Sequence, residues 1–187
     1  MIKEQVDRQN RVIQELLDFG RPSRQMVQPV NINSLMEKVL TFTTPMMRQH
    51  GIHLDVRFAP ELPMIYVDPS RIKQVFVNMI LNSIQAAPEG GTLCIDTCLQ
   101  DSFISVEFRD TGHGIEPEEL LRIFDPFYTT KESGTGLGLS ICHQIITSHS
   151  GTIHVSSTPG QGTVFKVRLP IQTDQGGTCN DTQGTGN

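Results

Sequence analysis

Hydrophobic positions recur with two different periods along the chain, and the two periods separate helices from strands. Over residues 69–87 the apolar side chains follow helical spacing, and this helix has a defined start because Asp68 is a favourable N-cap and Pro69 fits the first turn. Helical spacing also predicts helices over residues 34–50 and 137–150. Alternation of apolar and polar positions predicts strands over residues 51–58, 62–67, 93–99, 102–110, 152–157 and 163–169.

The order of these elements predicts the fold class. The strands within residues 93–110 and within 152–169 form two expected hairpins, and single helices separate the strand pairs. We therefore predict an α/β fold, a two-layer α/β sandwich in which a mixed, mostly antiparallel sheet carries its helices on one face. The chain of 187 residues is long enough for one domain with a core of its own and an appendage.

The two ends are expected to lie outside this domain. Residues 1–23 predict a helix with an apolar stripe, and such a helix either packs on the main domain or forms half of a coiled-coil or four-helix dimer stem. Residues 24–32, which include Pro29, are predicted to be a linker, and residues 33–171 form the main domain. Residues 172–187 have almost no apolar content, so we expect a disordered tail.

Charge and hydropathy exclude some classes of function. The net charge of −5 and the pI of about 5.6 argue against a dedicated nucleic-acid binder, which would present a basic face. No run of eighteen apolar residues occurs, and the first residues are polar, unlike a signal peptide. We expect a cytoplasmic location and no membrane contact by this part of the protein, whether or not the parent protein is anchored in a membrane.

Glycines at alternate positions, Gly134, Gly136 and Gly138, lead directly into a predicted helix. Glycine allows close backbone approach, and a helix start offers free N–H groups and a positive dipole end, so this pattern favours a bound phosphate. The P-loop motif is excluded because no lysine follows Gly138. The dinucleotide fingerprint is excluded because its third glycine comes one residue early and residues 139–173 contain no acid. A plain flexible turn is the other interpretation.

Two further patterns concern polar side chains beside apolar faces. Neutral amides follow one another along the helix over 69–87, and they can ligate a hard cation or donate to phosphate oxygens; a mildly polar surface edge is the alternative. These amides are Gln74, Asn78, Asn82 and Gln85. Asp110 continues the inward face of a strand, where a carboxylate needs a hydrogen-bond donor. The amino group of adenine is such a donor, and Gly112 and Gly114 would let the chain pass close to a flat ring; a turn capped by Asp110 is the alternative.

Together these segments resemble a known family. Asn78-x3-Asn82, Asp110-Thr-Gly-His-Gly114-Ile, Phe124-Asp-Pro-Phe127 and Gly134-Thr-Gly-Leu-Gly138-Leu resemble, in this order, the N, G1, F and G2 boxes of sensor histidine kinases. These kinases share an ATPase superfamily with gyrase B, MutL and the large heat-shock chaperone. The resemblance covers about residues 33–171 and implies the Bergerat-type ATP-binding fold. Within the family, residues 125–141 most resemble the nitrogen-regulation (NtrB-like) branch.

The resemblance implies roles for individual residues. Asp110 would accept from the adenine amino group with support from Thr163, and Asn82 with Asn78 would hold Mg²⁺. Residues 128–133 would form an ATP lid anchored by Phe124 and Phe127, and Lys131 would reach the terminal phosphates. Asn78 and Lys131 are the expected catalytic residues. The residues expected at ATP or ADP are Asn78, Asn82, Asp110, Gly112, Gly114, Ile115, Phe127, Thr129, Thr130, Lys131, Gly134, Thr135, Gly136, Leu137, Gly138, Leu139 and Thr163.

Two departures from the family pattern matter. Gln85 stands where many relatives carry a cation. None of the six histidines precedes an acidic residue, as the phosphoacceptor histidine of these kinases does; they are His50, His53, His113, His143, His149 and His154. Residues 1–23 resemble the second stem helix alone. We therefore expect a catalytic portion that binds Mg-ATP and phosphorylates a stem histidine of its own or a partner subunit in a homodimer, for relay to the receiver domain of a response regulator.

Three alternatives belong to other classes. The first is an ATP-hydrolysing switch of the gyrase or MutL type, which usually carries a glutamate four residues before the metal-binding asparagine. Asn78 occupies that position here and cannot act as a base. The second is an anti-sigma serine kinase, against which the stem-like residues 1–23 argue. The third is a catalytically dead nucleotide-binding module, against which the intact boxes argue.

Overall fold

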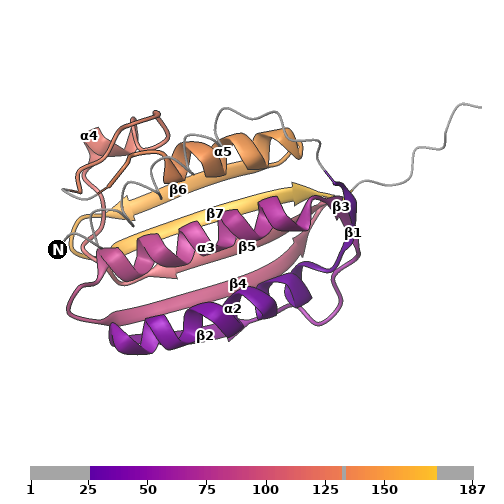
Figure 1. Ribbon diagram of the computed structural model, residues 1–187, viewed down its shortest axis with the longest axis horizontal. Helices are drawn as coiled ribbons and strands as arrows, with labels where there is room; N and C mark the ends of the chain where they lie inside the picture. The colour runs from indigo at the N-terminus through magenta and orange to yellow at the C-terminus, as the bar shows by residue number, and fades with distance from the viewer. Residues whose placement is uncertain (1–25, 132–133, 172–187) are drawn as a thin grey trace, which may run out of the picture.

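The computed structural model describes residues 26–131 and 134–171 (Figure 1). The predictions of a helix over residues 1–23 and of a disordered tail over 172–187 lie outside the described residues and stay predictions. No helix in the described part is long and apolar enough to cross a membrane.

The described residues form two layers, a five-stranded sheet and a layer of helices on one of its faces (Figure 1). The strand order is β2-β4-β5-β7-β6; β2 pairs with β4 in parallel, and the other three pairings are antiparallel. The strands are β2 Ile52–Arg57, β4 Gly91–Gln100, β5 Phe103–Asp110, β6 Thr152–Thr158 and β7 Gly162–Pro170, and the main helices are α2 Ile32–Gln49, α3 Pro69–Ala86 and α5 Gly138–Ser148. The predicted fold class, with its mixed and mostly antiparallel sheet, is confirmed.

Helix α3 lies in the middle of the helical layer and provides the centre of the core. Its side chains at Ile72, Val75 and Met79 are fully buried, and the ring of Phe76 packs against that of Phe108 in β5 with 5.8 Å between centroids. The predicted cap is present: the Asp68 carboxylate accepts from the backbone N–H of Ser70 at 2.9 Å and of Arg71 at 3.3 Å. The helix is therefore fixed both at its start and along its buried face.

The prediction of a linker over residues 24–32 is wrong for the part that the structure describes. Gln28–Val30 forms strand β1, which pairs antiparallel with β3, Ile65–Val67. The backbone N–H of Met26 also donates to Asp68 Oδ2 at 3.1 Å. A three-residue strand that contains proline is too short to show an alternating pattern. Its pairing partner lies 37 residues later in the sequence, so no local signal predicts this strand. The short helix α4, Pro117–Leu120, was not predicted either.

Two glycines in the β6–β7 hairpin differ in how closely they approach the end of β5. Gly160 and Gly162 both have positive φ, +75° and +104°, but only Gly162 is crowded: an added Cβ would collide with the carbonyl oxygen of Asp110. At Gly160, no atom of the described residues lies within 4 Å of an added Cβ. We expect Gly160→Ala to lower the free energy of unfolding by about 1 kcal/mol and Gly162→Ala by about 3 kcal/mol or more.

Urea denaturation of the two variants measures this difference. Equal losses of unfolding free energy would show that the close approach of β7 to Asp110 is not a constraint.

Candidate functional site

A cavity of about 240 Å³ opens between α3, the end of β5 and the segment that leads into α5. Helix α3 forms one wall, β5 and β7 form the floor, and residues 128–131 and 134–136 with Gly138 and Leu139 border the other side. The lining residues are Asn78, Leu81, Asn82, Gln85, Ala86, Asp110, His113, Gly114, Ile115, Glu119, Ile123, Tyr128, Thr129, Thr130, Lys131, Gly134, Thr135, Gly136, Gly138, Leu139, Thr163 and Phe165.

Asp110 lies at the floor of the cavity, with only 5% of its surface exposed. Its Oδ1 accepts from the backbone N–H of Gly112 at 2.9 Å and of Thr163 at 3.2 Å, and its Oδ2 accepts from the Ser83 hydroxyl at 3.3 Å. Burial raises the pKa of the carboxyl above its ordinary value, and the three hydrogen bonds act in the opposite direction. Asp110 thus caps the turn after β5, as one of the two interpretations predicted, and its carboxylate also points inward. The contact with adenine stays a prediction.

Three of the four amides predicted as a stripe line the cavity. Asn78, Asn82 and Gln85 do so, whereas Gln74 lies outside it and accepts from Arg71 Nη1 at 3.4 Å. The Nδ2 of Asn78 donates to the Gly138 carbonyl at 3.3 Å and to Cys142 Sγ at 3.5 Å. Because the amide hydrogens of Asn78 are used by α5, its Oδ1 is the atom that can accept from a ligand or bind a cation.

Lys131 reaches across the cavity to the same helix. Its Nζ donates to Gln85 Oε1 at 2.6 Å and to Asn82 Oδ1 at 3.2 Å. Desolvation of the ammonium group lowers its pKa, and the carboxylate of Asp110 acts in the opposite direction. A cation is therefore already placed against the amide oxygens of α3.

Helix α5 starts at the cavity without a side-chain cap. Its N-cap residue, Leu137, makes no capping hydrogen bond, and Gly138 and Leu139 of the first turn line the cavity. The first N–H groups of a helix have no partner within the helix, so these donors are available to an anion. An added Cβ at Gly138 would meet no described atom closer than 3.8 Å, so packing within the protein does not require glycine there. The absence of a side chain instead leaves room for a ligand at the helix start.

The structure brings most of the predicted site residues together. Those that line the cavity are Asn78, Asn82, Asp110, Gly114, Ile115, Thr129, Thr130, Lys131, Gly134, Thr135, Gly136, Gly138, Leu139 and Thr163. Gly112, Phe127 and Leu137 do not line it, and their contact with a nucleotide stays a prediction.

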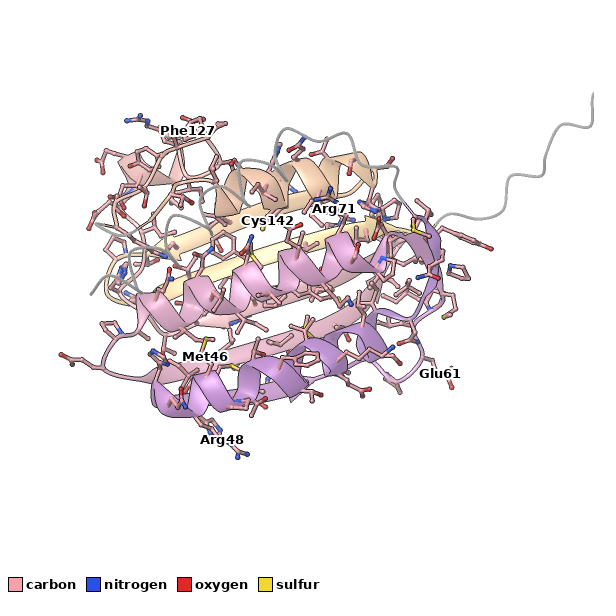
Figure 2. All side chains as sticks on the ribbon, in the orientation of Figure 1. Met46, Arg48, Glu61, Arg71, Phe127 and Cys142 are labelled. Carbon is pink, nitrogen blue, oxygen red and sulfur yellow. The ribbon has the colours of Figure 1, made fainter. Side chains whose placement is uncertain are left out.

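Each of these three residues has a structural role. An added Cβ at Gly112 would come within 2.6 Å of Ala86 Cβ, so this glycine lets the turn after β5 pack against α3. Phe127 is 64% exposed, with a φ of +67°, and it points outward near α4 (Figure 2). Leu137 is only 1% exposed and belongs to the core. A motif matched by sequence does not distinguish residues that contact a ligand from those that shape the loop.

Several lining residues were not predicted, and they are mostly apolar. Leu81 and Ala86 lie on the cavity side of α3, and Ile123 and Phe165 add apolar surface from two other segments. The first two share a helix face with Asn78, Asn82 and Gln85, so helical spacing could have identified them. Nothing in the sequence distinguishes Ile123 and Phe165 from ordinary core residues. His113 is exposed and also borders the cavity.

Comparison with known proteins gives the family. Residues 67–173 match the model of the histidine kinase-, DNA gyrase B- and HSP90-like ATPases. The chain belongs to this family. It also aligns with the catalytic domain of the histidine kinase ThkA at 34% identity and a TM-score of 0.71, covering 77% of this chain and 95% of that domain. The described residues thus form the ATP-binding catalytic domain of a sensor histidine kinase.

Longer relatives place this kinase domain in context. The sensor histidine kinase ZraS of Escherichia coli is 35% identical over 184 residues, which are 98% of this chain and 39% of ZraS. Full-length ShkA in complex with AMPPNP aligns at 27% identity and a TM-score of 0.82, covering 91% of this chain and 37% of ShkA. ThkA in complex with the response regulator TrrA aligns at 28% identity and a TM-score of 0.78, covering 91% of this chain and 49% of ThkA. The chain therefore spans less than half the length of these proteins.

The burial of Asp110 predicts how pH affects the stability of this kinase domain. Because its pKa is raised in the folded state, ionised Asp110 destabilises the fold above that pKa, and the penalty disappears as pH falls below the ordinary value near 3.8. In Asp110→Asn, the amide Oδ1 still accepts from Gly112 and Thr163, and its NH₂ group can donate to Ser83. We expect this variant to be at least as stable as the wild type at pH 7.

Urea denaturation at pH 7 and at pH 4 tests this expectation. The advantage of Asp110→Asn should shrink as Asp110 becomes protonated in the wild type. A variant clearly less stable at pH 7 would mean that the three hydrogen bonds to the carboxylate outweigh its desolvation.

Proposed function

We propose that this chain binds Mg-ATP and transfers the γ-phosphoryl group to a histidine on a stem helix, from which it passes to an aspartate of a response regulator. The main support for this proposal is that an acidic group and several positively polarised groups line one cavity. A buried carboxylate, Asp110, lies at the floor, and the ammonium group of Lys131 and the uncapped start of α5 border the same cavity. An acceptor for a base and donors for phosphates thus face one ligand-sized space.

Asp110 would select adenine. Its ionised carboxylate can only accept hydrogen bonds, and adenine presents an amino donor where guanine presents a carbonyl acceptor. The Ser157 hydroxyl contacts Thr163 Oγ1 at 2.9 Å, so Thr163 is held beside Asp110 as a second polar group for the base edge. Gly114 and Ile115, together with the apolar Leu81 and Ile123, would enclose the ring.

Asn82 and Asn78 would hold Mg²⁺. Their fit to a cation is supported by the donor set itself, because Asn82 Oδ1 already accepts from the Lys131 ammonium and the hydrogens of Asn78 are turned to α5. Amide oxygens are suitable ligands for this metal. When bound, Mg²⁺ supplies positive charge that neutralises the phosphates.

Lys131 and the start of α5 would bind the phosphates. Phosphoryl transfer depends mainly on positioning and on stabilising charge, and a lysine with free helix N–H groups supplies both. The backbone of Gly134, Thr135 and Gly136 would approach the phosphates, with Thr129, Thr130 and Leu139 bordering them. We place Asn78 and Lys131 in the catalytic role.

Transfer to histidine is favoured over hydrolysis by the chemistry of α3. Hydrolysis needs a general base for water, and the amide of Asn78, four residues before Asn82, cannot take a proton. The ThkA–TrrA complex supports a response regulator as the partner of the whole protein. We place that protein among dimeric kinases of the NtrB-like branch, active in the cytoplasm, where both ATP and a receiver domain are available.

The function is tested by calorimetric titration with ADP and with GDP, each with and without Mg²⁺. We expect micromolar ADP binding that Mg²⁺ strengthens, and no GDP binding. Asp110→Asn should weaken ADP binding more than tenfold while the fold is retained, because its NH₂ group would face the adenine amino group; such a loss corresponds to about 1.4 kcal/mol. Equal affinity for ADP and GDP would refute the role of Asp110.

The metal role has a separate test. Asn82→Ala should bind ADP with an affinity that no longer depends on Mg²⁺, since the ligand oxygen is removed. An unchanged Mg²⁺ titration would exclude Asn82 from the metal site.

The expected phosphate acceptor is also testable. With radiolabelled ATP, this chain alone should gain no acid-labile, alkali-stable phosphate, because none of its six histidines precedes an acidic residue. Such a label on this chain would show that one of them is an acceptor.

A further inference from the structure

We propose that Gln85 is the positioning residue for Lys131, holding its ammonium group in the cavity through a neutral oxygen so that the charge stays available to phosphate. The proposal rests on the proposed function for the role of the phosphates. The contact itself is independent of it.

The contact with Gln85 is the shorter of the two that hold the ammonium group. The Nζ of Lys131 lies 2.6 Å from Gln85 Oε1 and 3.2 Å from Asn82 Oδ1. Gln85 follows Asn82 by three residues on α3, so both side chains project from one face of the helix toward Lys131. The two oxygens together form an acceptor pair for one cation.

The backbone of Lys131 is also constrained. Its N–H donates to Thr129 Oγ1 at 3.1 Å, and its carbonyl accepts from the N–H of Gly134 at 3.1 Å. The side chain of Lys131 therefore starts from a hydrogen-bonded backbone and crosses the cavity to α3. There its ammonium group donates to Gln85, which is 46 residues away in the sequence.

The choice of an amide at position 85 has an electrostatic consequence. A carboxylate there would pair with the ammonium group and cancel its field, whereas an amide oxygen orients the group and leaves its full charge. Asp110 and Glu119 also line the cavity, but no hydrogen bond or ion pair joins either of them to Lys131 among the described residues. The carboxylate of Asp110 attracts the ammonium group from a distance, but both hydrogen-bond partners of the group are neutral, so no paired carboxylate blocks its contact with an anion.

Gln85 also removes a conflict at Asn82. The same Oδ1 that accepts from Lys131 is the atom we assign to Mg²⁺, and two cations on one oxygen would repel each other. The bond to Gln85 allows the ammonium group to leave Asn82 without leaving the cavity. Gln85 thus positions Lys131, and it does not itself need to touch the nucleotide.

The first test requires no nucleotide. Trypsin cleaves after lysine, so limited trypsin digestion followed by mass spectrometry reports the accessibility of the Lys131–Glu132 bond. We expect Gln85→Met, which keeps the length of the side chain and removes its acceptor, to raise the rate of this cleavage at least threefold. The matched control is Gln74→Met on the same helix outside the cavity, which should leave the rate unchanged. Equal rates in wild type and Gln85→Met would overturn the proposal.

The second test is a double-mutant cycle for AMPPNP affinity with Gln85→Met, Lys131→Met and the double variant. If Gln85 acts through Lys131, Gln85→Met weakens AMPPNP several-fold in the wild-type background and has no effect when Lys131 is absent. Independent, additive losses would overturn the positioning role. If wild type binds no AMPPNP while trypsin shows the predicted difference, the proposed function fails and the Gln85–Lys131 contact stands.

Discussion

The whole site depends on burying one ionised carboxylate at the end of a hydrophobic strand. Asp110 follows Phe108 on the inward face of β5, where an unpaired charge would be strongly destabilising. The fold satisfies it with two backbone N–H groups and one hydroxyl, and these come from the turn after β5, from β7 and from α3. The carboxylate can be buried only because these three elements pack closely, and it gives the cavity an acidic floor.

Helix α3 connects the hydrophobic core to the chemistry. One face packs into the sheet through fully buried side chains, and the neighbouring stripe presents Asn78, Asn82 and Gln85 to the cavity. Their positions are thus set by core packing rather than by a flexible loop. Asn78 adds a direct link to α5 through Gly138 and Cys142, so the amide stripe and the uncapped start of α5 are fixed relative to each other.

The sequence was sufficient for what depends on local pattern. The period of α3, its Asp68–Pro69 start, the two hairpins and the inward register of Asp110 are each encoded within a few residues and were predicted. The strand β1 was not, because its pairing with β3 is specified by a distant segment. The contact between Lys131 and Gln85 was missed for the same reason, since 46 residues separate them. The packing roles of Gly112 and Leu137 and the outward direction of Phe127 were not predicted, because a motif records residue identity and not the direction of a side chain.

The hydrogen bond from Met26 to Asp68 has a mechanical consequence. One oxygen of Asp68 caps α3 and the other holds the backbone of Met26, while the N–H of Asp68 donates to His149 Nε2 at 3.0 Å at the end of α5. The chain thus enters the domain at a joint that is bonded to both helices of the site. A force applied to the chain ahead of residue 26 would therefore reach the start of α3 and the end of α5 through these hydrogen bonds.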